Sequence, residues 1–290
     1  MTMKTGIVLE GGAMRGLFTA GVTDVLMEAG ITFDGAIGVS AGAAFGCNLK
    51  SRQIGRALRY NTAYCNDPRY CSFRSLLKTG DLYGADFCYH RIPYELDPFD
   101  VEAYNQNPMA FYVVCTDVET GRPVYQNCPI SNAESMQWFR ASASMPLVSR
   151  VVEVGGYRLL DGGVTDSVPL AYFESIGYER NLVILTQPEE YRKKPNKALP
   201  LMRLLLRKYP NLIKAVAERH NAYNAQVAYV RKQEQAGAAL VLCPKAALPV
   251  SHTEKDPEKL LEAYRLGREC AAENLDRIRA FLAAAKEAGH

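Results

Sequence analysis

A serine between two glycines is the first feature of this sequence that could do chemistry. Residues 38–42 read GVSAG, with Ser40 at the centre. Small neighbours allow a sharp backbone turn that holds a serine hydroxyl clear for nucleophilic attack, although the pattern is also compatible with a merely tight turn. A nucleophilic serine needs a base to accept its proton, usually a histidine. The chain has four histidines, none in a motif-like setting: His90, His220, His252 and His290.

A second glycine-rich stretch, EGGAMRG, occupies residues 10–16. Glycines allow successive backbone N–H groups to converge on an oxyanion, which is the electrostatic partner that a serine nucleophile needs. A phosphate-binding loop is the competing interpretation, but Leu17 and Phe18 stand where that loop requires Lys and Ser or Thr. Ala13 also replaces the second glycine of a dinucleotide fingerprint, although Asp34 lies at a suitable distance. These mismatches make nucleotide binding the weaker interpretation.

A third candidate, Asp161, ends an apolar run in the stretch LLDGG at residues 159–163. A carboxylate at the end of a strand, beside flexible glycines, can be presented into a cleft. Asp-Gly is also a common turn pair, which is the structural alternative. Asp161 lies so far beyond Ser40 in the chain that only the fold could bring the two side chains together.

The elements that would position these residues alternate between strand and helix. The pattern predicts a buried strand in residues 5–12, a helix in 15–30 that Gly30 ends, a second strand in 33–40 and a helix in 41–60 that begins directly after Ser40. This alternation favours a parallel sheet with helices packed on its faces.

The rest of the chain continues this pattern and then becomes helical. Further strands are predicted at 110–118, 122–127, 150–154, 157–161, 181–187 and 238–244, and helices at 131–143 and 169–177. Long helical patterns follow at 199–237 and 256–289. We therefore predict a catalytic domain in residues 1–187 and a helical C-terminal portion in residues 188–290 packed on it.

Composition limits the classes of function. The net charge of +3, from 34 Lys and Arg against 31 Asp and Glu, is too mild to indicate nucleic-acid binding. The eight cysteines form no Cys-x-x-Cys pair and no zinc-like spacing with histidine, so no metal is expected, and free thiols in the cytoplasm are the simplest interpretation. The N-terminus has no apolar signal-peptide core, and no uncharged run reaches the roughly 20 residues of a spanning helix.

The motifs in their chain order resemble the patatin-like phospholipase family. GGAMRG comes first, GVSAG follows soon after, and DGG comes later. RASASMP, at residues 140–146, is similar to the Ala-Ser-x-x-x-Pro segment that these proteins carry shortly before the catalytic aspartate. The likeness covers roughly residues 4–187 and looks closest to bacterial members. It implies a three-layer α/β/α sandwich with a mostly parallel central sheet, and hydrolysis of acyl lipids without a metal or organic cofactor.

The resemblance also implies roles for individual residues. Ser40 would be the nucleophile and Asp161 the base, as a Ser-Asp dyad without histidine. The amides of Gly11, Gly12 and Ala13 would form the oxyanion hole. Supporting positions are Arg15, Gly16, Gly38, Gly42, Gly162 and Gly163.

Two positions depart from the family pattern. Ala13 stands where many relatives have a third glycine, so its backbone is expected to avoid angles open only to glycine. Asp166 stands where relatives often have Asn before the proline represented here by Pro169. A second carboxylate near Asp161 would raise the apparent pKa of Asp161, and the two carboxyl groups would titrate as a pair.

Two other functions remain open. An α/β-hydrolase with a Ser-Asp-His triad would find its histidine in the right chain order at His220 or His252, but that fold usually places several strands before its serine, and only 39 residues precede Ser40. The same scaffold could instead be a catalytically silent membrane or protein adaptor. The co-occurrence of Ser40, Asp161 and the glycine loop counts against that alternative.

Residues 192–217 form a basic segment without Asp or Glu. Its eight basic residues are Arg192, Lys193, Lys194, Lys197, Arg203, Arg207, Lys208 and Lys214, and its apolar face would comprise Leu201, Leu204, Leu205, Ile213 and Val216. A helix here could lie peripherally on anionic lipid. An ordinary packed helix with a solvated basic face is the alternative. The expected partner is an acyl lipid, and the expected location is the cytoplasm with peripheral contact to a membrane.

Overall fold

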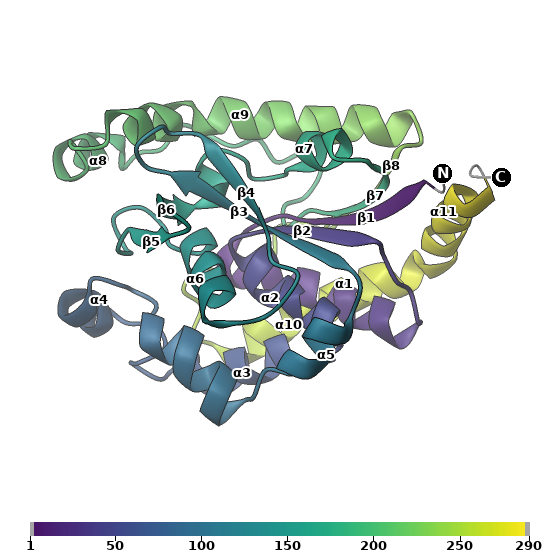
Figure 1. Ribbon diagram of the computed structural model, residues 1–290, viewed down its shortest axis with the longest axis horizontal. Helices are drawn as coiled ribbons and strands as arrows, with labels where there is room; N and C mark the ends of the chain where they lie inside the picture. The colour runs from purple at the N-terminus through teal and green to yellow at the C-terminus, as the bar shows by residue number, and fades with distance from the viewer. Residues whose placement is uncertain (1–2, 288–290) are drawn as a thin grey trace.

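One mixed sheet organises the chain, and helices cover both of its faces (Figure 1). This computed structural model describes residues 3–287, so His290 lies outside the described residues. The strands are β1 (Lys4–Leu9), β2 (Gly35–Val39), β3 (Ala110–Asp117), β4 (Pro123–Asn127), β5 (Val152–Val154), β6 (Tyr157–Asp161), β7 (Tyr178–Ile184) and β8 (Ala239–Leu242). Their order is β5-β6-β3-β2-β1-β7-β8, with β4 paired to β3. The neighbouring strands β3, β2, β1, β7 and β8 are parallel. The pairings of β3 with β4, of β3 with β6 and of β5 with β6 are antiparallel.

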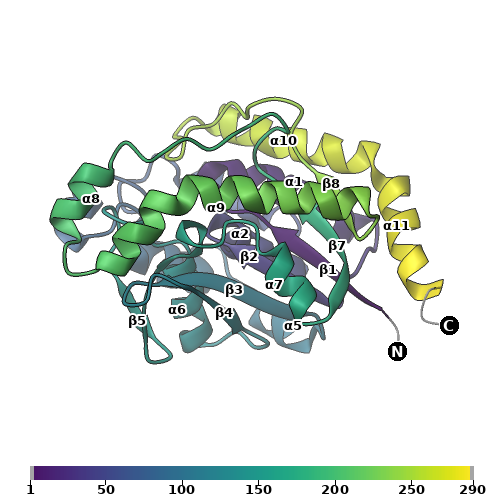
Figure 2. The same cartoon turned by 90° about the horizontal axis from the view of Figure 1, so that it is seen from above.

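The helices form two layers, one on each face of the sheet. The principal helices are α1 (Gly16–Glu28), α2 (Ala41–Ser51), α3 (Arg56–Tyr64), α4 (Phe73–Thr79), α5 (Val101–Gln106), α6 (Ala133–Ser142), α7 (Leu170–Ser175), α8 (Leu199–Leu205), α9 (Pro210–Gln235), α10 (Pro257–Glu273) and α11 (Leu275–Glu287). α7 and α9 lie over one face, as the view from above shows (Figure 2), and α1, α2 and α6 lie on the other. The predicted three-layer α/β/α architecture is confirmed.

Alternating side chains of the central strand explain why both faces are covered. In β1, Ile7 and Leu9 belong to the core beneath α1 and α2, whereas Val8 belongs to the core beneath α7 and α9. All three side chains are fully buried. A strand buried on both faces reads as a continuous apolar run, which is what the sequence shows at this position.

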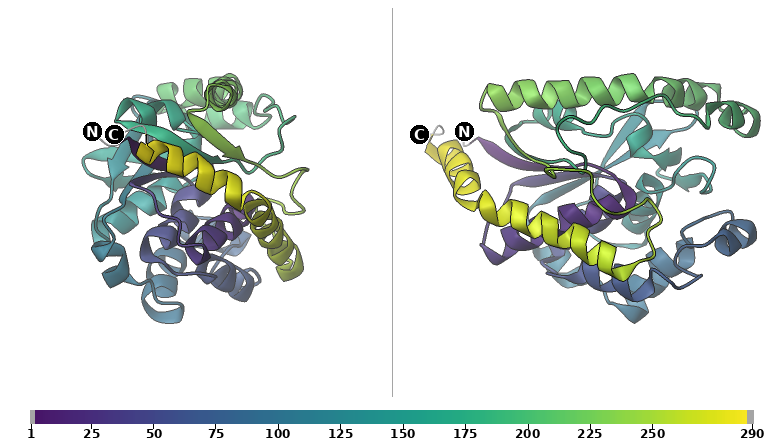
Figure 3. Two further views of the ribbon diagram at one scale, coloured as in Figure 1. Left: turned by 90° about the vertical axis from the view of Figure 1, so that its right-hand side faces the viewer. Right: turned by 180° about the vertical axis from the view of Figure 1, so that it is seen from behind.

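The C-terminal portion is woven into the same three layers. β8 pairs with β7 and extends the sheet. α10 packs along α1, where Gly21 and Gly267 allow the two backbones to touch (Figure 3). A Cβ at Gly21 would lie 2.1 Å from Tyr264 O, and a Cβ at Gly267 would lie 2.0 Å from Phe18 O. Helices therefore approach more closely here than any side chain on these two positions would permit.

Three predicted helical stretches are divided in the structure, among them 256–289, which is separated at Asn274 into α10 and α11. The stretch 41–60 breaks where Arg52 takes a left-handed conformation (φ 56°), which separates α2 from α3. The stretch 199–237 breaks before Pro210, which cannot continue a helix but suits its first turn, so α8 and α9 are separate. Between residues 65 and 107, where no element was predicted, lie α4, α5 and a π-helix, η2 (Phe87–Leu96).

Asp34, the position that suited a ribose contact, has a structural role instead. Its carboxylate accepts hydrogen bonds from the amide (2.7 Å) and the hydroxyl (2.9 Å) of Thr5, which ties the start of β2 to β1. Among the helices formed by residues 3–287, none combines the length and apolar character needed to cross a membrane.

Candidate active site

Ser40 lies at the sharp turn between β2 and α2. Its backbone angles, φ 54° and ψ −121°, are ones that residues other than glycine rarely adopt. The flanking glycines are required by contact: a Cβ on Gly38 would lie 2.7 Å from the Ala43 backbone, and one on Gly42 would lie 2.3 Å from Leu9 O. The turn therefore has the strained geometry predicted for a nucleophile elbow, with Ser40 partly exposed at its tip.

Ser142, in the RASASMP segment, stabilises this turn through hydrogen bonds. The Ser40 amide donates to Ser142 Oγ (2.9 Å), and the Ser142 hydroxyl donates to Val114 O on β3 (2.7 Å). Ser142 is fully buried. Ser144 Oγ donates to Arg140 O (2.8 Å) within its own helical turn. Ser142 thus links the strained turn to the sheet, a role that sequence reasoning missed.

Asp161 reaches Ser40 because of the strand register. β2 pairs with β3 up to Val39 opposite Val114, and β6 pairs with β3 so that Asp161 is opposite Cys115. β4 occupies the other edge of β3. The two strands therefore run towards each other along one edge of β3 and end at adjacent positions.

Burial dominates the electrostatics of Asp161, which is 5% exposed. Burial raises the pKa of this carboxyl, while the nearby Ser40 side chain, the charge of Arg219 and the Gly163 amide lower it in part. The Gly163 N–H donates to Asp161 Oδ1 over 2.7 Å. Asp161 therefore lies where it can accept a proton from Ser40.

The glycine loop lies on the other side of Ser40. Gly11 is packed so closely that a Cβ there would be 2.9 Å from the Ser40 Cβ. Gly11, Gly12 and Ala13 line a cavity together with Ser40. Ala13 has φ 49°, in the left-handed region that favours glycine and that other residues adopt only uncommonly.

A buried carboxylate, Glu10, anchors the glycine loop. It accepts hydrogen bonds from the Thr186 amide (2.5 Å) at the end of β7 and from the Tyr223 hydroxyl (2.9 Å) on α9. Its burial raises the pKa of the carboxyl, and these bonds lower it in part. Sequence reasoning missed this residue, and its only signal was an acid at a strand end before two glycines.

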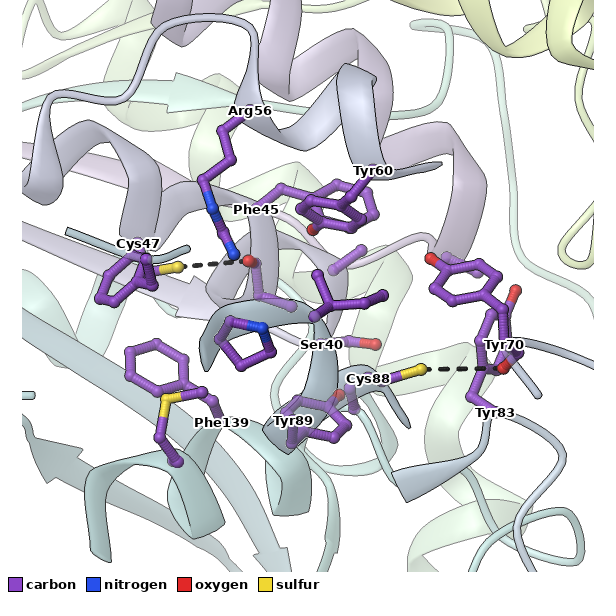
Figure 4. Close-up of a pocket in the computed structure, with 18 of the residues that line it drawn as sticks. Ser40, Phe45, Cys47, Arg56, Tyr60, Tyr70, Tyr83, Cys88, Tyr89 and Phe139 are labelled. Atoms are coloured by element: carbon purple, nitrogen blue, oxygen red, sulfur yellow. Dashed lines mark hydrogen bonds between the residues drawn. The ribbon is translucent and has the colours of Figure 1, made fainter. Parts of the chain in front are cut away.

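Two cavities meet at Ser40. The first, about 120 Å³, is apolar and aromatic (Figure 4). Its walls include Ala44 and Phe45 on α2, Tyr60 on α3, Tyr89 on η2 and Phe139 on α6. The second cavity, about 380 Å³, contains Asp161 and the glycine loop, and basic side chains from the C-terminal portion line it.

Asp166 does not form a pair with Asp161. Its Oδ2 accepts a hydrogen bond from the Tyr125 hydroxyl (2.7 Å), and burial raises the pKa of Asp166 to about 6. The main charged groups that act on the pKa of Asp161 are Arg219 and Lys193. The structure thus gives no support to the expected coupled titration.

His220 and His252 are each hydrogen-bonded to another group. His252 Nε2 lies 3.2 Å from Arg15 Nη1, and His220 Nδ1 lies 3.0 Å from Ala217 O. In residues 3–287 neither imidazole is hydrogen-bonded to Ser40 or Asp161, so the arrangement that a Ser-Asp-His triad needs is not formed. The same residues contain no group of three or more His, Cys, Asp or Glu placed to hold a metal ion.

Comparison with known proteins agrees with this geometry. A model of the patatin-like phospholipase family matches residues 7–174, more than half of the chain. The chain belongs to the patatin-like phospholipase family. A second model, a domain of unknown function (DUF6363), matches residues 209–283 of this patatin-like protein. Family membership supports a lipid hydrolase activity.

Individual relatives are distant. The uncharacterised protein YjjU of Escherichia coli is 26% identical over 278 residues, 92% of this patatin-like chain and 76% of YjjU. The lysophospholipase nte1 of Aspergillus terreus is 26% identical over 185 residues, 60% of this chain and 11% of that protein. An NTE family protein of Mycobacterium bovis, Mb1092c, is 24% identical over 62% of this chain and 48% of its own length. The crystal structure of VipD from Legionella pneumophila has a TM-score of 0.47 at 12% identity, over 94% of this chain and 67% of VipD.

Proposed function

We propose that this patatin-like protein is a serine carboxylic-ester hydrolase of the phospholipase or lysophospholipase type. One observation carries the proposal: Ser40, on its strained turn after β2, and buried Asp161, at the end of β6, follow adjacent positions of β3 and line one cavity together with the glycine loop. In this proposal Ser40 is the nucleophile, Asp161 is the base, and the amides of residues 11–13 bind the oxyanion.

The reaction balances without a metal or organic cofactor. Asp161 accepts the Ser40 proton as Ser40 Oγ bonds to the acyl carbonyl carbon, and the carbonyl oxygen becomes an oxyanion facing the loop amides. The C–O bond to the alcohol then breaks, and the alcohol leaves with the proton from Asp161. A water molecule then attacks the acyl carbonyl carbon and gives one proton to Asp161. The bond between that carbon and Ser40 Oγ breaks, Asp161 returns the proton to Ser40 Oγ, and the fatty acid leaves.

The apolar cavity suits the acyl chain. It opens beside Ser40 and carries aromatic and aliphatic walls, so a hydrocarbon chain placed there is removed from water. Its one charged side chain, Arg56, is already satisfied, because its guanidinium donates to Asp97 O (2.7 Å) and Asn48 Oδ1 (3.1 Å). Among the described residues, the only charged side chain that lines this cavity therefore needs no ligand as a partner.

Contact with a membrane forms part of the proposal, but only some of residues 192–217 belong to the proposed surface. Val216 is buried and Lys193 lines the second cavity, so neither belongs to an exposed face. The exposed apolar side chains of α8 are Leu201, Leu204 and Leu205, and those of α4 are Phe73 and Leu77. Both helices lie at the same end of the molecule (Figures 1 and 3), with Arg74, Lys78, Arg203, Arg207 and Lys208 exposed around them. Apolar side chains ringed by cations suit an anionic lipid surface.

A test of membrane contact uses anionic and neutral vesicles. Leu204→Ser combined with Phe73→Ser is expected to weaken binding to anionic vesicles, whereas Leu261→Ser, on α10 and 44% exposed, serves as the matched control. Equal, salt-insensitive binding of the parent protein to both kinds of vesicle would remove the electrostatic part of this proposal.

The catalytic assignment is tested with a soluble ester and a fluorophosphonate probe. Ser40→Ala is expected to lower turnover by on the order of 10⁴ and to abolish labelling. Asp161→Asn is expected to cost about 10³ to 10⁴ in turnover, by analogy with the loss of a triad base. Ser144→Ala, which removes a hydroxyl outside both cavities, is the control and keeps its labelling.

Each rival predicts a different result. His220→Ala and His252→Ala are each expected to lower turnover by less than about tenfold, because neither imidazole is hydrogen-bonded to Ser40. Loss of turnover in a folded histidine variant would favour the triad of an α/β-hydrolase. A parent protein that neither binds the probe nor cleaves any ester would be the silent adaptor.

A further inference from the structure

Basic side chains face Ser40 across the second cavity without acidic partners. The four that line it are Arg15, Lys193, Lys194 and Arg219, and none of them forms an ion pair within residues 3–287. The acids in the cavity wall are Glu10 and Asp161. Glu10 is hydrogen-bonded to Thr186 and Tyr223, and Asp161 is the proposed base for Ser40. The cavity thus has an excess of positive charge.

Lys193 is held in this wall by its backbone. Its N–H donates to Asn224 Oδ1 (2.9 Å) and its carbonyl accepts from Asn224 Nδ2 (3.1 Å), which fixes the segment to α9. Its ammonium lies 4.4 Å from the centre of the Tyr223 ring, a favourable cation–π position, and donates no hydrogen bond within the described residues. The charge is therefore positioned but left free for a ligand.

Arg219 completes the wall next to the base. Its Nε donates to Gly163 O (2.5 Å), and the Gly163 N–H in turn donates to Asp161. No hydrogen bond from its two terminal nitrogens is formed within residues 3–287. A guanidinium with free nitrogens is suited to bidentate contact with a phosphate.

We infer that this wall binds a terminal phosphate on the leaving alcohol, so that monoacyl lipids with a phosphate monoester headgroup are the preferred substrates. The inference rests on the proposed function and adds a substrate class to it. Ser40 belongs to both cavities, so a lipid with its acyl chain in the apolar cavity would extend its alcohol into the basic one. A cationic headgroup would be repelled there, and an uncharged glyceride would gain nothing from the charges.

The inference also gives a role to the C-terminal portion. Lys193, Lys194 and Arg219 all lie beyond residues 7–174, and Arg219 belongs to the region matched by the domain of unknown function. The C-terminal portion, which contains Lys193, Lys194 and Arg219, would thus recognise the headgroup in the active site.

Three octanoyl esters test the preference. The probes are 1-octanoyl-glycerol 3-phosphate, 1-octanoyl-glycerol and 1-octanoyl-glycerophosphocholine, compared by kcat/KM. The phosphate monoester is expected to be preferred, and Lys193→Gln is expected to lower the ratio of phosphate monoester to uncharged ester by about tenfold or more. Lys232→Gln, the same change at an exposed position of α9, keeps the ratio. An unchanged ratio in Lys193→Gln, or a parent without preference, would overturn the inference.

The pH dependence gives a second readout. Burial and the neighbouring Arg219 lower the pKa of Lys193 to about 8, with Arg15 acting in the same direction and Glu10 and Asp161 opposing it. The charge is present below this pKa and is lost as pH rises through it. A phosphate monoester stays dianionic from pH 7.5 to 9.5, since its second pKa is about 6. The preference is therefore expected to fall over that interval in the parent and to persist in Lys193→Arg, whose guanidinium stays charged.

A binding experiment separates this inference from the proposed catalysis. Glycerol 3-phosphate and inorganic phosphate are each titrated calorimetrically into Ser40→Ala, with and without Lys193→Gln. Glycerol 3-phosphate is expected to bind, and Lys193→Gln to weaken it about tenfold or more. Its binding without any Ser40-dependent cleavage would refute the proposed function alone. Ester cleavage without its binding, or binding of inorganic phosphate only, would refute the headgroup pocket alone.

Discussion

Ser40 and Asp161 meet because their strands converge on one edge of β3. Val39 pairs with Val114, and Asp161 pairs with the next residue, Cys115. β2 arrives parallel to β3 and β6 antiparallel to it, so the two carboxyl ends point at each other. A serine and an acid far apart in sequence are thus held by backbone pairing, and no third side chain is needed between them.

The first prediction concerns Ser142, whose hydroxyl links the Ser40 amide to Val114 O on β3. Ser142→Ala would leave the Ser40 amide and Val114 O without their bridging hydroxyl, and each unsatisfied buried group costs about 1–3 kcal/mol. We expect a lower free energy of unfolding and a turnover lowered by about tenfold to a hundredfold, with fluorophosphonate labelling at Ser40 slowed but present. Urea unfolding and labelling rates measure both effects.

Ser144→Ala is the matched control for Ser142. Its hydroxyl bonds only within its own helical turn, so the change is expected to cost less than about 1 kcal/mol. Labelling of a folded Ser142→Ala variant at the parent rate would show that this hydroxyl does not support the turn.

The parts of the site that sequence predicted lie where local chemistry and strand ends coincide. Ser40 and Asp161 both follow buried apolar runs, and glycines mark the turns on either side of Ser40. Such signals survive in a single sequence because they are set by backbone sterics over a few residues. The boundary at residue 187 is a different matter: β8, from the C-terminal portion, joins the same sheet, and the two-part division stays a prediction.

The parts that sequence did not predict depend on tertiary contact. Much of the wall of the apolar cavity comes from residues 60–99, which form short helices and the π-helix η2 with Pro93 inside it. No 3.6-residue period runs through that stretch. Lys193 belongs to a run of charged residues, which predicts a solvent-exposed segment. In the structure its backbone is hydrogen-bonded to Asn224, and its side chain lines the second cavity. Sequence spacing carries no trace of that contact.

The second prediction concerns acyl-chain length. Ala44 lies one helical turn after Ser40 and lines the apolar cavity. Ala44→Phe would fill the space beside the nucleophile, so hydrolysis of octanoyl esters is expected to fall by at least about tenfold relative to acetyl esters. A series of esters of increasing chain length, assayed by kcat/KM, measures the change.

Ala44→Val provides an intermediate for the same series. Its smaller side chain is expected to shift the preferred chain length less than Phe does. Fluorophosphonate labelling with a small alkyl group reports that Ser40 is still reactive. An unaltered chain-length profile in a labelled Ala44→Phe variant would show that the acyl chain lies elsewhere.

The third prediction concerns the crossing of α1 and α10. Gly267→Ala would normally favour a helix by about 1 kcal/mol, but its Cβ would lie 2.0 Å from Phe18 O. The helices must separate, so we expect a net loss of about 1–3 kcal/mol in the free energy of unfolding. Urea unfolding measures it, with the exposed Ala272→Ser as control. A more stable Gly267→Ala variant would mean that the two helices are not in backbone contact.

The fourth prediction uses the raised pKa of Asp166. Its folded pKa is about 6 against an ordinary value of 3.8, so the folded protein holds this proton more tightly than the unfolded chain. The neutral carboxyl contributes its full stability below the ordinary value, and that contribution is lost as pH rises from about 4 through 6. Above pH 7 the buried charge costs about 3 kcal/mol.

Asp166→Asn removes this charge and keeps an acceptor for the Tyr125 hydroxyl. We expect the variant to be more stable than the parent by about 1–3 kcal/mol at pH 7.5 and nearly equal to it at pH 4, in urea unfolding at both pH values. Asp86→Asn, at an exposed position, is expected to change neither value by more than about 0.5 kcal/mol. Because Tyr125 rather than Asp161 is the partner of Asp166, the acid limb of kcat/KM for a neutral ester is expected to stay in place. A limb displaced by a whole pH unit would restore the coupled pair of carboxyl groups, and a variant less stable at pH 7.5 would show that the ionised carboxylate stabilises this part of the sheet.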